Sequence, residues 1–143
     1  MQFVIFKLGE EHFAVETDKV LSINDMMTIT KVPKAPNYIK GLINLRGSIK
    51  SLVDLNLLLN IESDKKQNNI IILKVDEEEL GVTVDDVEEV IDIEENKLQK
   101  LDNHSTEANI KGIIHLDDKL LTVINIEKLI NQWKVRDRNG RGT

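Results

Sequence analysis

The sequence contains no cysteine, which excludes disulfide scaffolds, thiol catalysis and cysteine-based zinc sites. Aromatic residues are also scarce, with three Phe, one Tyr and one Trp in 143 residues. The formal net charge is −6, divided as +1 over residues 1–60 and −7 over residues 61–143. Because nucleic-acid binding needs a basic surface and usually aromatic platforms, this composition argues against DNA or RNA as the main partner.

Long apolar runs are missing as well. The chain starts with Met1 followed directly by an alternating segment, with neither a basic leader nor a stretch of membrane-spanning length. We therefore expect a soluble cytoplasmic protein with no direct membrane insertion. A chain of this length can bury about two-thirds of its unfolded surface, so it can fold without disulfides or metal.

What the sequence does contain is an internal duplication. Residues 3–23 align without gaps on residues 70–90, and residues 39–59 align in the same way on residues 110–130. The segment IKGLINL recurs as IKGIIHL. A repeat of about 70 residues suits a small sub-domain, so we expect two similar lobes related by a pseudo-two-fold axis, with function in the cleft between them.

Each repeat predicts two β-hairpins. Alternating apolar residues flank short polar turns, and the expected strand pairs are Phe3–Leu8 with His12–Val15, Leu42–Leu45 with Ile49–Val53, Ile70–Val75 with Leu80–Val84, and Ile113–Leu116 with Leu120–Ile124. Small sheets avoid exposed edges by closing, which favours an all-β fold of two closed or nearly closed barrels. We expect a first lobe over residues 1–62, a connector over 63–69, a second lobe over 70–133 and a fraying polar tail over 134–143.

Other segments give weaker signals. Val20 and Ile23 have helical spacing, and so do their counterparts Val87 and Val90, which suggests one or two helical turns after each first hairpin. The leucine-rich segments 55–59 and 126–133 are expected to be helices that close the lobes. By contrast, residues 31–37 are expected to be extended because they contain both prolines, and residues 102–109 form a polar loop that we expect to be mobile.

Catalytic and metal-binding patterns are weak. Possible nucleophiles and bases are present, but none lies in a recognisable catalytic motif: Ser48, Ser51, His12, His104 and His115. The acidic clusters at 76–79, 85–89 and 94–95 lack the spaced oxygen ligands and central glycine of a calcium loop, so a solvated acidic face is the better interpretation. We expect no enzyme activity, no metal and no cofactor.

The turn at Arg46-Gly47 is the informative site. In the second repeat, Asn44, Arg46 and Gly47 are replaced by His115, Asp117 and Asp118, although the surrounding aliphatic pattern is kept. A plain hairpin turn is an equally good interpretation of this motif taken alone. Because the duplicated turn carries the opposite charge, however, the arginine is dispensable for the fold.

These residues also carry a resemblance. The opening segment 3–23, followed by ITKVPKAPNYIKGLINLRGSIKSLVDL, closely resembles the CheW family of chemotaxis coupling proteins, over residues 3 to about 129. The motif VP..P..IKG.INLRG is specific to that family and matches here at Val32, Pro33, Pro36, 39–41 and 43–47. The resemblance implies two SH3-like barrels of about five strands each, in an adaptor that joins the histidine kinase CheA to the cytoplasmic tips of chemoreceptors.

The resemblance also implies where partners bind. The regulatory domain of the kinase is expected to contact Val20, Ile23, Lys40, Ile43 and Asn44. Receptor tips are expected to enter an apolar groove between the lobes, where Gly41, Arg46, Ile70 and Ile71 converge. Burial of Val20 and Ile23 under a helical turn is an equally good interpretation of those two residues. We expect the isolated protein to be a monomer that is recruited to receptor arrays. Two alternative functions remain: a small-barrel binding module for another protein, and a coupling domain of a different chemosensory pathway.

Overall fold

The computed structural model describes residues 1–101 and 109–141, and the side chains of 136–141 are not described. The described part is mostly β-structure, with two α-helices and two short 3-10 helices. Its strands are β1 (Gln2–Leu8), β2 (Glu11–Glu16), β3 (Val20–Asp25), β4 (Ile39–Leu45), β5 (Ser48–Asp54), β6 (Asn69–Val75), β7 (Glu78–Val84), β8 (Asp86–Asp92), β9 (Leu98–Lys100), β10 (Ile110–Leu116) and β11 (Lys119–Ile124).

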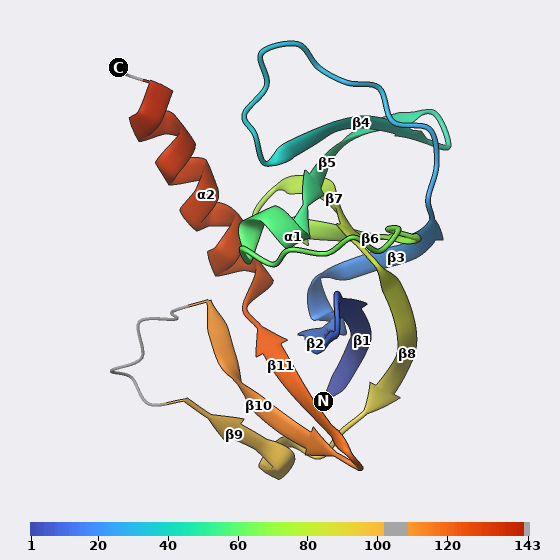
Figure 1. The fold of residues 1–143 in the computed structure, drawn as a ribbon, viewed down its shortest axis with the longest axis vertical. Helices are drawn as coiled ribbons and strands as arrows, with labels where there is room; N and C mark the ends of the chain where they lie inside the picture. Colours follow the sequence, from blue (N-terminus) through green and yellow to red (C-terminus); the bar gives the residue numbers. More distant parts are fainter. Residues whose placement is uncertain (102–108, 142–143) are drawn as a thin grey trace.

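These strands form two sheets. The first sheet has the order β8-β1-β2-β11-β10-β9, and the second has the order β3-β6-β7-β5-β4. All four expected hairpins are present as antiparallel pairs, which confirms the all-β fold of two similar halves (Figure 1). Within the described residues no ladder joins the two edge strands of either sheet, so both barrels are incompletely closed, and the first has six strands rather than five.

The sheets do not follow the boundaries we expected at 1–62 and 70–133. The hairpin β1–β2 of the first repeat lies in the sheet built from β8 to β11 of the second repeat. Reciprocally, the hairpin β6–β7 of the second repeat lies among β3, β4 and β5 of the first. Parallel pairing of β2 with β11 and of β7 with β5 joins the exchanged hairpins to their hosts. Hairpin patterns are local and do not specify which sheet a hairpin joins, so the sequence could not reveal the exchange.

The segment after the first hairpin is also different from our expectation. Instead of helical turns, Val20–Asp25 forms strand β3, with a 3-10 turn at Thr17–Lys19 before it, and the second repeat has β8 at the same place. Burial alternates along β3 with a period of two, and the strand pairs with β6. The spacing of Val20 and Ile23, three positions apart, fits either a helix or a bulged strand. Pairing with β6 makes this segment a strand.

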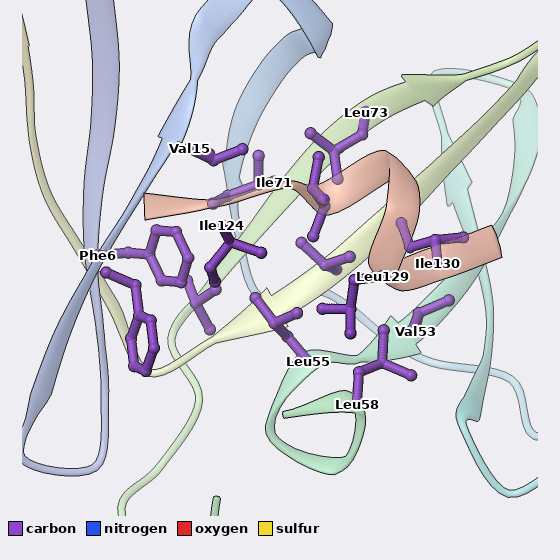
Figure 2. Packing of buried hydrophobic residues seen from close by; sticks show 14 of the residues in the cluster. Phe6, Val15, Val53, Leu55, Leu58, Ile71, Leu73, Ile124, Leu129 and Ile130 are labelled. Carbon is purple, nitrogen blue, oxygen red and sulfur yellow. The ribbon is translucent and has the colours of Figure 1, made fainter. Parts of the chain in front are cut away.

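The hydrophobic core has three parts. One cluster fills the inside of the first sheet around Phe3 and Ile5, and another lies inside the second sheet around Ile43 and Ile70. The largest cluster lies between the sheets and takes residues from both repeats (Figure 2), among them Phe6, Val15, Val53, Leu55, Leu58, Ile71, Leu73, Ile124, Leu129 and Ile130. The expected cleft between the lobes is therefore occupied, at its centre, by packed side chains.

Two helices close the structure, as expected. Helix α1 (Leu55–Leu58) and helix α2 (Ile126–Arg141) each follow the second hairpin of a repeat. Helix α2 continues through residues 134–141, which we expected to fray; at the start of that stretch Lys134 pairs with Glu78 at 2.7 Å. The expected polar loop at 102–109 falls almost wholly outside the described residues.

Candidate protein-interaction surfaces

The turn at Arg46-Gly47 is a tight hairpin turn with positive φ at both central residues, 54° at Arg46 and 86° at Gly47. This is the type I′ pattern that matches the twist of the flanking strands. Asn44, on the strand before the turn, accepts a hydrogen bond at its Oδ1 from the Gly47 backbone N–H at 2.8 Å. Asn44 therefore stabilises the turn, while its exposed position leaves its outer side accessible.

The Arg46 side chain is exposed, and none of the described residues forms an ion pair or hydrogen bond with its guanidinium. Its counterpart Asp117 has the same φ of 54° and is exposed as well. Both repeats thus turn over two residues and carry opposite charges at the first of them, although the second turn residue has a positive φ at Gly47 and not at Asp118. Because neither charge is needed for the turn, the Arg46 cation is available to a partner.

The IKG segment contains a bulge in both repeats. The register of β4 against β5 shifts between Ile39 and Gly41, and β10 shifts in the same way against β11. Gly41 is buried, and a Cβ added there would lie 2.5 Å from the carbonyl oxygen of Thr30. Gly41 therefore allows a backbone segment to pack on β4, where Thr30 pairs with Leu42. Its placement gives it a structural role and no accessible side chain.

Strand β3 provides an apolar edge. It is the outer strand of the second sheet, with Leu21 51% and Ile23 37% exposed on one face. Val20 is half-buried and packs against the central core cluster. The alternative that Val20 and Ile23 are both buried under a helical turn is wrong. Exposed apolar side chains on an unpaired strand edge are typical of a protein interface.

Three of the predicted contact residues lie in the core. Ile43, Ile70 and Ile71 are at most 1% exposed. Ile43 and Ile70 face the inside of the second sheet. Ile71 faces the central cluster, where Figure 2 labels it. A partner cannot touch these side chains while the sheets are intact. The prediction that they contact partners directly therefore needs correction. Neither the resemblance nor the position of Ile70 and Ile71 beside the connector revealed that the folded sheets cover these side chains.

A groove that the sequence did not reveal lies beside β4, with a volume of about 650 Å³. We call it the first groove. Its lining comes from the segment after β3, from β4, from the end of β5, from α1 and from residues 61–67, which run into the connector. The lining residues are Met26, Ile29, Lys40, Asp54, Asn56, Leu57, Ile61, Glu62, Ser63, Lys65 and Gln67. Lys40 donates a hydrogen bond to Gln67 Oε1, and Gln67 Nε2 donates to Asp54 Oδ1 at 3.4 Å. The connector appeared in the sequence as a plain linker, so its contribution could not be foreseen.

The rim of this groove carries an exposed ion pair. Lys65 Nζ lies 2.6 Å from Glu10 Oε1, so the connector is tied to the first hairpin. The hydrogen bond from Lys65 lowers the pKa of Glu10, and the same bond raises the pKa of Lys65. Ser63 donates a hydrogen bond at 3.0 Å to the buried Asp85 Oδ2, which also accepts from the Gly9 N–H at 2.7 Å.

The candidate catalytic residues are not brought together. Ser48 and Ser51 lie on β5 in the second sheet, whereas His12 and His115 lie on β2 and β10 in the first. His12 Nε2 lies 3.1 Å from Glu88 Oε1 across the sheet, and His104 lies outside the described residues. Within the described residues no three metal-ligating side chains cluster in a way that could hold an ion, and none of the helices is long and apolar enough to span a membrane.

Comparison with known proteins agrees with this architecture. The family model for the CheW-like domain matches residues 2–134. "Chemotaxis protein CheW" of Thermotoga maritima is 33% identical over 135 residues, covering 92% of this chain and 89% of that protein. "Chemotaxis protein CheV3" of Helicobacter pylori is 25% identical over 141 residues, where the match covers 92% of this chain but 45% of that protein.

A solved structure gives the same result in three dimensions. The crystal structure of the scaffolding protein TtCheW from Thermoanaerobacter tengcongensis matches with a TM-score of 0.80 and 34% identity, covering 90% of each chain. The sequence match thus spans both repeats, and the likeness in structure extends to the arrangement of the two sheets. The chain belongs to the CheW-like family.

Proposed function

We propose that this protein is a non-enzymatic chemotaxis adaptor that couples the cytoplasmic tips of chemoreceptors to the histidine kinase CheA and supports receptor control of kinase activity. The observation that carries the proposal is the CheW-like match over residues 2–134, together with relatives named for chemotaxis and a structural neighbour described as a scaffolding protein. An adaptor needs exposed contact surfaces, and the β3 edge and the Arg46 turn provide them. We place it in the cytoplasm, as a monomer in isolation that is recruited to receptor arrays.

The kinase contact uses the accessible members of the predicted set. Ile23 is an exposed apolar anchor on β3, Lys40 lines the first groove, and Asn44 stands beside the turn. Val20 and Ile43 support these residues from below. Apolar anchors at such interfaces each contribute on the order of 1–3 kcal/mol.

The receptor contact centres on Arg46, whose free cation suits a carboxylate or carbonyl at the end of a receptor helix. Ile71 lies opposite Ile23 in the β3–β6 ladder, and Ile70 lies opposite Asn24. Ile70 and Ile71 therefore act by fixing the position of β3, and Gly41 acts by fixing the segment that packs on β4. Small transient interfaces of this kind give micromolar affinities, with array avidity adding the rest.

Reconstitution tests this function. Purified full-length protein is titrated with the kinase and, separately, with a soluble receptor tip, and kinase autophosphorylation is followed with all three present. We expect binding to both partners and receptor-dependent stimulation that requires the adaptor. Absence of binding to either partner, with a folded protein, would refute the proposal.

A second candidate is a coupling domain that serves a different chemosensory pathway. The match to CheV3 shows that a similar region makes up about half of a longer chemotaxis protein, so such a domain also occurs in another chain arrangement. The contact surfaces would be the same and the partners would differ. Binding to the kinase of one pathway and not of another, measured side by side, distinguishes the two.

A further inference from the structure

The duplication provides an internal comparison for the first groove. A second pocket, of about 140 Å³, lies at the equivalent place in the other half. Its Lys111, Asn125 and Glu127 correspond to Lys40, Asp54 and Asn56 in the repeat alignment. Asp54 and Asn125 also play the same local role, since each accepts a hydrogen bond from the backbone at the start of its helix.

In the second pocket the charges are paired within the protein. Lys111 Nζ lies 2.7 Å from Glu16 Oε1, and Lys19 Nζ lies 3.5 Å from Glu127 Oε2. Strand β2 brings Glu16 to this place by running parallel to β11. In this half, the lysine of the IKG segment is therefore paired with a carboxylate that the exchanged hairpin supplies.

In the first groove the corresponding carboxylate is missing. The residue equivalent to Glu16 is Thr83, which lies opposite Asp54 in the parallel ladder of β5 and β7. Thr83 is fully buried, and its hydroxyl has no hydrogen-bond partner in the described part of the chain. Lys40 instead contacts the neutral amide oxygen of Gln67, and no described carboxylate lies within ion-pair distance of its ammonium.

Among the other charged groups of the first groove, Lys65 and Asp54 already have partners, whereas the Glu62 carboxylate has none among the described residues. Lys65 is paired with Glu10 at 2.6 Å. One Asp54 oxygen accepts from the Leu57 backbone N–H at 3.3 Å as well as from Gln67. Lys40 is thus the cation in this groove that an external carboxylate can neutralise, and Leu57, 39% exposed, offers an apolar contact beside it.

We propose that the first groove docks an acidic segment of the kinase partner. A carboxylate of that segment takes the place at Lys40 that Glu16 occupies at Lys111, displacing Gln67, and an adjacent apolar side chain packs against Leu57 and Met26. The inference rests on the proposed coupling function. It goes beyond that function by assigning the occupant's chemistry and by adding the start of α1 and the connector to the contact surface.

The test compares matched lysine variants of the full-length protein, Lys40→Gln and Lys111→Gln. We expect Lys40→Gln to weaken kinase binding about tenfold and to flatten its salt dependence, while receptor-tip binding stays unchanged. Lys111→Gln should bind the kinase normally and should only lower the melting temperature, because it loses an internal ion pair. Leu57→Asp should weaken kinase binding as well, whereas Gln67→Ala should not, since it removes a competitor for Lys40.

The possible failures are distinguishable. Normal kinase binding by folded Lys40→Gln and Leu57→Asp would overturn the groove assignment and leave the coupling function standing. If Lys40→Gln weakens receptor-tip binding but leaves kinase binding normal, the groove binds the receptor and the proposal that it binds the kinase is wrong. Equal loss from the two lysine variants would show that the unpaired lysine has no special role. If the unaltered protein binds neither partner, the coupling function fails, and this inference fails with it.

Discussion

Reversing the charge at Arg46 separates folding from recognition. The substitution Arg46→Asp places in the first repeat the residue that the second repeat has at the same turn position. Both positions have a φ of 54°, and both side chains are exposed. Aspartate is among the residues that adopt this left-handed conformation most readily, so the turn should accept it without rearrangement.

The two expected magnitudes differ. The described residues offer Arg46 no ion pair or hydrogen bond whose loss would cost stability. The free energy of unfolding should therefore change by less than about 1 kcal/mol, the range for exposed sites. If a partner carboxylate contacts Arg46, the reversal removes a favourable pair and adds a like charge. A loss of about 2 kcal/mol in binding, roughly thirtyfold in Kd, is then expected.

The assay uses Asp117→Arg as the matched control. This variant makes the opposite change at the first turn residue of the other half, which has the same φ of 54°. Melting temperature, receptor-tip affinity and receptor-stimulated kinase phosphorylation are measured for both variants. We expect both to fold, with coupling lost in Arg46→Asp alone. Normal coupling by Arg46→Asp, or equal damage from the two reversals, would refute the reasoning that the asymmetry of the turns carries recognition.

Three further predictions follow from single residues. Ile23→Asp, at a side chain 37% exposed, should leave the melting temperature nearly unchanged and weaken kinase binding; a large drop in melting temperature with normal binding would contradict the contact. Gly41→Ala puts a Cβ 2.5 Å from the Thr30 carbonyl oxygen and should destabilise by roughly 1–3 kcal/mol in urea unfolding; an unchanged midpoint would be inconsistent with this packing. Lys65 lowers the pKa of Glu10, so the Glu10–Lys65 pair stabilises the fold above the ordinary carboxyl pKa and this stabilisation is lost as the pH falls through the lowered pKa. Glu10→Gln should therefore reduce the loss of stability at acid pH; identical stability–pH curves for the two proteins would disprove this.

Local features of the fold could be predicted from the sequence, and global ones could not. The hairpins were predictable because alternation and polar turns are encoded within about fifteen residues. The segment from Val20 to Asp25 was misjudged because four residues cannot distinguish a helical period from a bulged strand. Helix α2 extends beyond its apolar pattern because helix propagation costs little once a helix has started, which the apolar pattern alone does not reveal.

The candidate site was predictable to the extent that it depends on local conformation. The Arg46 turn could be found because the duplication displayed its counterpart beside it. Burial of Ile43, Ile70 and Ile71 could not be foreseen, because each depends on which sheet covers the strand. The first groove was missed because it combines separate segments between Met26 and Gln67 that become neighbours only when this part of the chain folds back on itself.

The exchange of hairpins explains why the two halves can differ in chemistry while sharing a scaffold. Each sheet depends on both repeats, and the largest core cluster lies between the sheets, so neither half can lose its pattern of buried residues without weakening the other. The turns and groove walls are not subject to that constraint. The two halves differ at exposed or half-exposed positions of the same framework. Arg46 is replaced by Asp117, and Lys40 contacts Gln67 where Lys111 pairs with Glu16. A duplicated scaffold whose halves are interlocked, with its variation confined to those positions, fits the proposed coupling function, in which two different surfaces contact two different partners.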